Sequence, residues 1–535
     1  MPLTDSMQHT PFAFSFSVGV KNVLQRLYVK MPVMFLAIGI TVNGCAVGPN
    51  FKEPKAPDTN TYTSAPLRQK IPAVPETRTP GQRIVFGQDI PFQWWTLFHS
   101  QEINQVMQRA LANNPTLASA EAAIRQAQEL FYATVGSSLL PRVDANASVT
   151  RSKSSGTELG QSNTHPAPFT LYNATVNVTY TLDIAGGARR ELESLRAQVD
   201  YQRFQREAVY LTLTSNIVTT AIREASLRGQ LQAMREIVAF QERQLTMIER
   251  QYEFGALAFA EVLAQRTQLA QTKTNLPPLE KELAQTRHLL AVLAGILPNE
   301  AGALPEFTLA NLTLPGDLPV SLPSSLVRQR PDIRASEELL HAACAKIGVA
   351  TANLYPQVTL SGGGGYSALQ PSQLFHPGAS AWNLGAGLLQ PLFRGGELAA
   401  KRRASVAAYD QAEAQYRLVV LQAFQNVADV LRALELDALA LKAQADAETA
   451  AKNALDLTRK QFELGAVSYL LLLNAERQYQ QAKIGLVVAQ TARFADTAAL
   501  FQALGGGWWN RDAKTDTQSL SAKENQAHVL ETSKP

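Results

Sequence analysis

Four short stretches of the chain alternate between apolar and polar residues. In the strictest of them, from Tyr172 to Leu182, every second residue is apolar and each residue between is Asn or Thr. A period of two predicts a β-strand with one apolar and one polar face. The pattern places strands at about 142–151, 172–182, 357–367 and 381–390. Strands of about ten residues with these faces fit a tilted outer-membrane strand, but a soluble sheet with one buried face alternates identically.

Four strands are too few to close a barrel in lipid. An open edge there leaves backbone N–H and C=O groups without hydrogen bonds, at several kcal/mol each. Outer-membrane barrels begin at about eight strands. A membrane sheet built from this chain therefore requires strands from several copies, and the pattern leaves eight and twelve strands open.

Long helical patterns flank the strand pairs. No proline occurs between Gly187 and Phe254 or between Gly396 and Leu464, and a helix of about 67 residues spans about 100 Å. In the second stretch, apolar residues recur at spacings of three and four, which is typical of a coiled-coil seam. These residues are Tyr416, Val420, Phe424, Val427, Leu431, Leu434, Ala438 and Leu441. A globular bundle is the alternative, although its helices usually run about 8 to 20 residues.

The chain contains an internal duplication. Residues 250–273 align with residues 460–483 without a gap, as expected of a repeat. In each copy a helical pattern ends at a glycine, Gly255 or Gly465, and a second helical pattern follows after a few small or polar residues. Glycine suits the left-handed cap that ends a helix. Each copy therefore predicts a helical hairpin with the glycine at its tip.

The N-terminus has the pattern of an export signal. Basic residues precede an apolar run over residues 31–42, which is shorter than a membrane span and typical of a signal peptide. The run ends at Val-Asn-Gly-Cys, which resembles a bacterial lipobox with Cys45 as the acylated first mature residue; Asn43 is unusual there. Ala46 stands where an aspartate would favour the inner membrane, so this resemblance implies the outer membrane. The alternative is ordinary cleavage nearby, with Cys45 incidental.

Composition argues against several functions. The 535 residues carry a net charge of +4 and only 18% charged residues, too mild a balance to indicate a nucleic-acid binder. Two cysteines exclude a disulfide framework. His341 and Cys344 could share a helix face as metal ligands, but no further ligands cluster nearby, which favours a buried cysteine beside an exposed histidine. No nucleophile elbow, P-loop or dinucleotide fingerprint occurs, so the sequence predicts no enzyme, cofactor or metal site.

Two further motifs complete the pattern, namely Cys-Ala-Val-Gly-Pro-Asn-Phe at residues 45–51 and Trp-Trp-Thr-Leu-Phe at residues 94–98. Together with the duplicated helix-strand-strand-helix order and the paired tips, they resemble the TolC family of outer-membrane efflux factors, in its NodT-like or OprM-like lipoprotein branch. The resemblance covers about residues 45–507. It implies a mainly α fold with a membrane β part, in which three chains share a twelve-stranded β-barrel that a periplasmic α-helical barrel continues.

The resemblance also implies a function. The homotrimer would be a passive exit duct for small molecules handed over by an inner-membrane pump, of the RND class, and a periplasmic membrane-fusion adaptor. Gly255 and Gly465 would lie where the adaptor docks. The other expected contact is outer-membrane lipid, with no nucleic acid.

The second tip departs from the family's pattern. Relatives often carry acidic residues there, where they narrow the mouth of the channel, whereas the matching positions here are Leu471 and Asn474. A constriction at this tip would be apolar and amide-lined. Glu261 is the acidic residue identified near the tips, and a gate role and a solvated charge at a helix start are both open for it.

These observations divide the chain. Residues 1–44 are expected to be a signal peptide, 45–93 an extended lipid-anchored segment rich in proline, 94–297 the first repeat with its tip at 254–261, 298–323 an equatorial connector, 324–507 the second repeat with its tip at 464–474, and 508–535 a disordered tail.

The sequence leaves two rival functions open. One is a lipid-anchored periplasmic coiled-coil scaffold without a pore, and the other is an outer-membrane enzyme with an unrecognised site.

Overall fold

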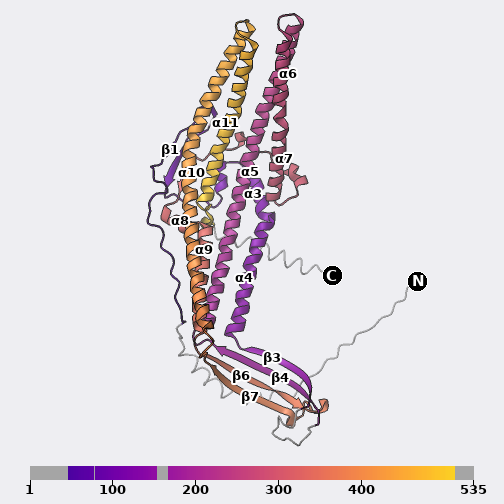
Figure 1. Ribbon diagram of the computed structural model, residues 1–535, viewed down its shortest axis with the longest axis vertical. Helices are drawn as coiled ribbons and strands as arrows, with labels where there is room; N and C mark the ends of the chain where they lie inside the picture. Colours follow the sequence, from indigo (N-terminus) through magenta and orange to yellow (C-terminus); the bar gives the residue numbers. More distant parts are fainter. Residues whose placement is uncertain (1–45, 78, 154–166, 512–535) are drawn as a thin grey trace, which may run out of the picture. The chain divides into compact units, whose positions relative to one another are not determined.

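The structure of the protein is a computed structural model that describes residues 46–77, 79–153 and 167–511 (Figure 1). The predicted signal peptide, Cys45 and most of the predicted C-terminal tail lie outside the described residues. The chain separates into two compact units. The first comprises Ser137–Arg190 and Gly348–Ala400 together with the chain up to Gly48, and the second comprises Pro49–Gly136, Glu191–Ile347 and the chain from Lys401.

The first unit contains the four predicted strands, here β3 (Arg142–Ser152), β4 (Phe169–Leu182), β6 (Gln357–Ala368) and β7 (Ser380–Leu389). They form one sheet in the order β3-β4-β6-β7, and every neighbouring pair is antiparallel. Short 3-10 turns at Pro371–Gln373 and Pro377–Ala379 join β6 to β7. The prediction of two strand pairs, one from each repeat, is confirmed.

The register of this sheet aligns the apolar residues of all four strands. Val178 of β4 lies opposite Val143 of β3 and Gly362 of β6, and Gly362 lies opposite Leu384 of β7. The next row, one residue along, is polar: Asn177 of β4 lies opposite Asp144 and Gly363, and Gly363 lies opposite Asn383. Since successive side chains point to opposite faces of a strand, the sheet has one apolar and one polar face.

Nine α-helices occur in the described residues. They are α3 (Gln101–Asn113), α4 (Pro115–Leu139), α5 (Gly187–Glu253), α6 (Phe259–Thr274), α7 (Leu276–Leu293), α8 (Pro323–Gln329), α9 (Pro331–Ala352), α10 (Glu397–Glu463) and α11 (Tyr469–Ala503). Both proline-free stretches form single helices of 67 residues, α5 and α10. The order α4-β3-β4-α5 recurs as α9-β6-β7-α10, which confirms the duplicated helix-strand-strand-helix repeat.

The predicted seam of α10 is the buried face of this helix in the second unit. All of the predicted seam residues except Phe424 are buried. Phe424 is only partly buried, and its neighbour Ala423 is buried instead. The buried residues from Tyr416 to Ala438 belong to a core that also contains Trp94 and Phe501, whose rings stack with centroids 5.3 Å apart. Leu441 lies in a separate small cluster with Val74 and Ala445. The 3-10 turn Trp94–Phe98 therefore packs into the helices.

A small sheet in the second unit was not foreseen. We expected the proline-rich segment before residue 93 to be extended, with little helix or sheet. Instead β1 (Lys70–Ile71) pairs with β2 (Gln82–Phe86), and β2 pairs in parallel with β5 (Asp317–Val320) of the connector. Short 3-10 turns lie at Pro75–Thr77, Pro298–Ala303, Leu309–Asn311 and Trp508–Asn510. Ile71 and Ile84 are buried, because apolar residues between the prolines join the core.

Among the described helices, α11 alone is long and apolar enough to cross a membrane by length and composition. Core helices of soluble proteins pass the same test. Two charged residues of α11, Glu476 and Arg493, are buried within the protein.

Arg493 connects several elements of the second unit. It is 1% exposed, and its guanidinium donates to Gln82 Oε1 of β2 at 2.6 Å and to the Leu434 carbonyl of α10 at 3.2 Å. Gln82 in turn donates to the Pro315 carbonyl at 3.1 Å. The unforeseen sheet is thereby tied to two long helices.

Replacing Arg493 with alanine is expected to destabilise the second unit by about 2–4 kcal/mol, because two buried acceptors lose a charged donor and a cavity remains. The midpoint of thermal unfolding in detergent, followed by circular dichroism, measures the loss. Arg417→Ala is the matched control, since Arg417 is an exposed α10 residue that pairs with Glu413 four positions away, and such pairs contribute little. Equal midpoints for the two variants would contradict the assigned role.

Candidate functional site

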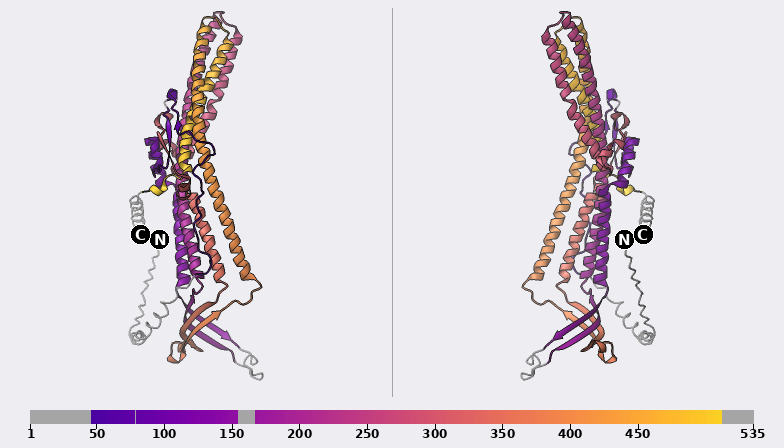
Figure 2. Two further views of the ribbon diagram at one scale, coloured as in Figure 1. Left: turned by 90° about the vertical axis from the view of Figure 1, so that its left-hand side faces the viewer. Right: turned by 90° about the vertical axis from the view of Figure 1, so that its right-hand side faces the viewer.

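The two helical hairpin tips lie in the second unit (Figures 1 and 2). At the first tip α5 ends at Glu253 and α6 begins at Phe259, and at the second α10 ends at Glu463 and α11 begins at Tyr469. Each long helix therefore turns back within five residues.

Both tips use the same helix-terminating geometry. Gly255 has φ +72° and donates its N–H to the Tyr252 carbonyl at 2.9 Å. Ala256 donates its N–H to the Gln251 carbonyl at 2.8 Å. Gly465 has φ +70°, and the matching bonds of the second tip have the same lengths. This is a Schellman motif, in which glycine avoids the steric cost of a left-handed residue. The structure thus places both predicted glycines at the turns.

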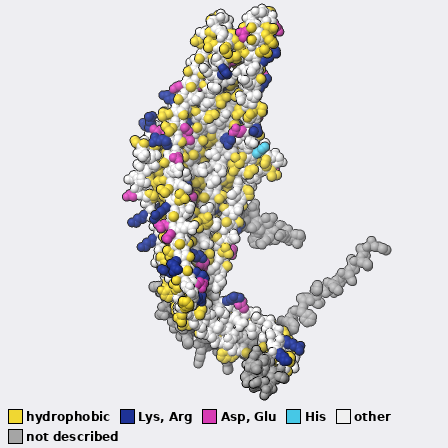
Figure 3. Space-filling model, in the orientation of Figure 1, with side chains coloured by type: hydrophobic (Ala, Val, Ile, Leu, Met, Phe, Trp, Pro, Cys, Tyr) yellow, Lys and Arg dark blue, Asp and Glu magenta, His cyan; other side chains and the backbone are white. Residues whose placement is uncertain are grey.

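The tips expose apolar side chains. Phe254, directly before Gly255, is 85% exposed, and Leu464, directly before Gly465, is 84% exposed. Apart from the adjoining residues, no described atom lies within 4 Å of the position that a Cβ would take on either glycine. Figure 3 shows hydrophobic side chains gathered over both tips. Exposed apolar patches of this kind mark interaction sites.

The predicted gate residues are placed differently from one another. Glu261 is the third residue of α6, and its Oε2 accepts the N–H of Ala258 at 2.8 Å, so its carboxylate caps the start of the helix. Leu471 is 48% exposed on the first turn of α11, and Asn474, one turn later, accepts a hydrogen bond from Arg477. The carboxylate of Glu261 is therefore already used to cap α6. Leu471 and Asn474 place an apolar and an amide side chain on the same helix, α11.

The two hairpins pack against each other behind the tips. A small apolar cluster contains Ile248 and Val262 from the first hairpin and Leu455, Tyr469, Leu472, Leu473 and Ala475 from the second. Within it the Tyr469 hydroxyl donates to Gln265 Oε1, and Gln265 Nε2 donates to the Gln241 carbonyl at 3.1 Å. This contact between the hairpins could not be predicted from the sequence, because no local pattern in one repeat indicates which side chain of the other repeat it contacts.

A second acidic residue, Glu476, lies behind the second tip, and no local sequence pattern marks it as buried. It is 2% exposed, and neither carboxylate oxygen has a hydrogen-bond partner in the described part of the chain. It borders a cavity of about 180 Å³ together with Phe240, Arg459, Tyr479 and Lys483. Burial raises the pKa of Glu476 to about 7, and the charge of Arg459 offsets only part of that effect.

Glu476 is expected to make the tips less stable as pH rises. An ordinary glutamate ionises near pH 4.3, so between that value and about 7 the folded form binds more protons than the unfolded form, and stability falls with increasing pH. Glu476→Gln removes this penalty, which is about 4 kcal/mol above pH 7 and close to zero below pH 4. Hydrogen exchange of tip amides at several pH values, corrected for intrinsic rates, measures the difference.

Glu249→Gln is the matched control for that experiment, because Glu249 is more exposed and already paired with Arg266 at 2.7 Å. The Glu249→Gln variant keeps Glu476, so the loss of tip stability with rising pH that is assigned to Glu476 should persist in it. A Glu476→Gln profile that also followed the wild type would show that the carboxylate does not limit tip stability.

His341 and Cys344 lie on α9 and contact protein groups. The His341 ring stacks on Phe51 with centroids 4.4 Å apart and its Nε2 lies 3.1 Å from Glu193 Oε1. Cys344 is buried, with its Sγ 3.8 Å from the Pro49 carbonyl. No group of three or more potential metal ligands occurs within residues 46–77, 79–153 and 167–511.

Both repeats of the chain match a known protein family. The family model described as outer membrane efflux protein matches residues 106–296 and 322–506, one segment for each repeat. The chain belongs to this family. Its members are outer-membrane efflux channels, and this protein is accordingly an outer-membrane transport channel with periplasmic helices and not an enzyme, as predicted.

Three relatives illustrate the match. The pyoverdine export outer membrane protein OpmQ of Pseudomonas aeruginosa is 32% identical over 443 residues, which cover 81% of this chain and 90% of OpmQ. The probable outer membrane lipoprotein SilC of Salmonella typhimurium is 26% identical over a region that covers 90% of this chain and 99% of SilC. The solved structure of the outer-membrane channel OprN superimposes with a TM-score of 0.76 at 27% identity, covering 87% of this chain and all of OprN. The predicted TolC-like fold is confirmed.

Proposed function

We propose that three copies of this outer membrane efflux protein pool their strands into one barrel, which forms the passive exit duct of a tripartite efflux system. The observation that carries the proposal is the four-stranded sheet with two open edges. Within the described residues, β3 and β7 each pair with one neighbouring strand only. In lipid both edges need partners.

Antiparallel order allows identical copies to supply those partners. Because four strands alternate in direction, β3 and β7 run in opposite directions. The β7 edge of one copy can therefore pair with the β3 edge of the next in the same antiparallel pattern, and any number of copies above one gives an even-stranded barrel. Three copies, hence twelve strands, follow from the resemblance to the TolC family.

The two faces of the sheet suit a water-filled barrel. The apolar row through Val178 and Leu384 would face lipid, and the polar row through Asn177 and Asn383 would face the lumen, as in other outer-membrane barrels. A polar lumen gives solutes a hydrated path without a binding step. Substrate choice then belongs to the pump and the adaptor.

The tips are the proposed contact with the periplasmic adaptor, and through it with an inner-membrane pump of the RND class. Exposed Phe254 and Leu464 beside Gly255 and Gly465 supply an apolar surface. Leu471 and Asn474 are proposed to line the closed mouth. Glu261 is a weaker gate candidate, because its carboxylate already caps α6.

Cys45 is proposed to carry the lipid anchor. It lies outside the described residues, but Ala46 and Val47, which follow it, belong to the unit that contains the strands. An acylated Cys45 would therefore attach its lipid to the membrane-spanning unit. The description of the relative SilC as a probable outer membrane lipoprotein supports this proposal.

Reconstitution tests the channel. The purified protein is expected to migrate as a heat-modifiable oligomer and to conduct ions as single channels in planar bilayers. Two neighbouring β7 residues distinguish its faces: Leu384→Lys should prevent assembly, because a charge at mid-membrane costs about 2–4 kcal/mol in each copy, whereas Asn383→Lys should assemble and shift ion selectivity toward anions. A soluble monomer without conductance would support a periplasmic scaffold instead.

A further inference from the structure

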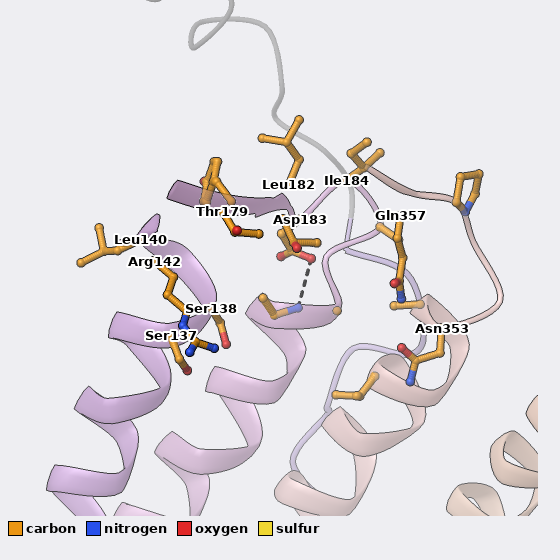
Figure 4. A pocket seen from close by; sticks show the side chains of 18 residues that line it. Ser137, Ser138, Leu140, Arg142, Thr179, Leu182, Asp183, Ile184, Asn353 and Gln357 are labelled. Atoms are coloured by element: carbon orange, nitrogen blue, oxygen red, sulfur yellow. Dashed lines mark hydrogen bonds between the residues drawn. The ribbon is translucent and has the colours of Figure 1, made fainter. Parts of the chain in front are cut away.

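Each face of the four-stranded sheet carries a pocket. The pocket of the polar face, about 420 Å³ in volume, lies where the strands meet the helix ends of the first unit (Figure 4). The dashed line in Figure 4 marks the hydrogen bond that Asp183 accepts from the N–H of Ala188, at 3.0 Å. Arg142, which also lines this pocket, pairs with Asp144 at 2.7 Å. Because these charged groups are paired within the protein, this pocket gives no sign of a charged ligand.

The pocket of the apolar face is an open recess of about 540 Å³ across β3, β4 and β6. Its floor consists of small residues that the strand register places side by side, namely Ala145, Ala147, Ala174 and Gly364. On the same face of β3, the larger and exposed Val143 and Val149 lie before and after the two alanines. The face is therefore hollowed between bulkier apolar rows.

An aromatic pair borders this recess. Tyr366 of β6 lies on the apolar face, and Phe375, from the connection between β6 and β7, packs edge-on against it with ring centroids 5.4 Å apart. Phe375 is exposed. Outer-membrane barrels carry girdles of aromatic residues where the hydrocarbon meets the headgroups. The floor and the border of the recess are both apolar, so its chemistry matches an acyl chain.

Arg151 lies on the same face, beyond the recess. Because successive side chains of a strand alternate between its faces, Arg151 follows Val149 on the apolar face of β3. It lies four residues after Ala147, about 14 Å along the strand, and it is exposed, as is Lys153. Within the four described strands the one acidic residue is Asp144, near the other end of β3. This end of the apolar face is therefore positively charged.

The recess and Arg151 fit the outer leaflet of the membrane. β3 begins at Arg142, shortly after α4 ends, and the helices are periplasmic, so Arg151 is at the outer end of the strand. Ala145 lies six residues before Arg151, about 20 Å along the strand, and a tilt of about 40° leaves about 15 Å across the membrane. The hydrocarbon core is about 30 Å thick, so this depth is that of one leaflet.

We propose that the recess binds an acyl chain of lipid A, the phosphorylated glycolipid of the outer leaflet, and that Arg151 contacts a phosphate of the same molecule. The inference rests on the proposed membrane barrel. The small residues give the chain apolar surface to cover, and a guanidinium forms strong charge-assisted hydrogen bonds with phosphate. A phospholipid offers the same two groups, but the outer position of Arg151 favours lipid A, because phospholipid occupies the inner leaflet of this membrane.

Lipid binding to the purified, delipidated oligomer in detergent tests the site. Native mass spectrometry counts the molecules bound after addition of lipid A or, separately, of dioleoylphosphatidylglycerol. Saturable binding of lipid A is expected, with one molecule for each recess and about tenfold higher affinity than for the phospholipid. Heat-modifiable migration of the same sample shows separately whether the oligomer has formed.

Filling the recess should weaken binding of lipid A about tenfold. Gly364→Leu does this, because apart from the adjoining residues no described atom lies within 4 Å of a Cβ at Gly364, and the added side chain takes the place of the acyl chain. Ala386→Leu is the matched control, since Ala386 lies on the apolar face of β7, opposite Leu360, and outside the recess. It adds comparable apolar bulk and should bind lipid A as the wild type does.

Removing the charge should weaken binding to a similar degree. Arg151→Gln is expected to bind lipid A about tenfold less tightly, because charge-assisted hydrogen bonds to the phosphate are lost. Lipid A stripped of its phosphates should bind this variant and the wild type equally. Arg142→Gln is the control, since Arg142 lies at the other end of β3 on the polar face.

The outcomes separate the inference from the proposed barrel. Oligomers that bind lipid A no more tightly than phosphatidylglycerol overturn the inference and leave the barrel in place. Unchanged binding by Gly364→Leu overturns the role of the recess, and unchanged binding by Arg151→Gln overturns the phosphate contact. A wild-type protein that forms no oligomer overturns the barrel and the inference with it.

Discussion

Gly465→Val is expected to weaken adaptor docking about tenfold while leaving the oligomeric barrel intact. Gly465 has φ +70°, where a β-branched residue costs about 1–2 kcal/mol or more. The space around the residue is open, so the cost is conformational, and the tip relieves it by changing the shape that it presents. A docking loss of about 1.4 kcal/mol is a tenfold weaker interaction.

Gly465→Asn isolates the conformational part, because asparagine tolerates the left-handed region better than valine. We expect adaptor binding in a pull-down to be strongest with glycine, weaker with asparagine and weakest with valine. Drug resistance of the complemented deletion strain should follow the same order. Gly302→Val is the matched control: Gly302 has equally open surroundings but no positive φ. Normal oligomers with normal efflux in the Gly465→Val strain would defeat the prediction, and lost oligomers would move the role of the tip to assembly.

Cys45→Ala is expected to abolish incorporation of radiolabelled palmitate completely, because the thioether to the diacylglyceryl group needs the thiol. The protein contains only one other cysteine, Cys344, which is buried on α9. Cys344→Ala is therefore the control and should keep the full label. Label that persisted after Cys45→Ala would contradict the lipobox interpretation, and equal label loss in both variants would indicate a defect in export.

Much of the fold could be predicted because its signals are local. The alternation in β4 and the lack of proline in α5 and α10 each depend on one continuous stretch, and the structure has these elements at nearly the predicted bounds. The turn glycines were identifiable for the same reason, since a helix end is encoded within a few residues.

The parts that were missed depend on contacts between distant residues. β2 and β5 are short and lie more than 200 residues apart in the sequence, so neither has a period long enough to recognise. Glu476 reads as a solvated charge on a helix, and only the packing of the two hairpins makes it buried. The Tyr469–Gln265 contact likewise joins the two repeats, and a pattern within one repeat cannot contain it.

The two open edges of the sheet also have a kinetic consequence. The open edges are long, with 11 residues in β3 and 10 in β7. Because the edges are paired only when separate chains meet, the rate of barrel assembly falls steeply at low protein concentration. A synthetic peptide with the sequence of β7 would occupy the β3 edge of a newly exported chain and stop further addition there. Such a peptide would act as a chain terminator of channel biogenesis without blocking a finished pore.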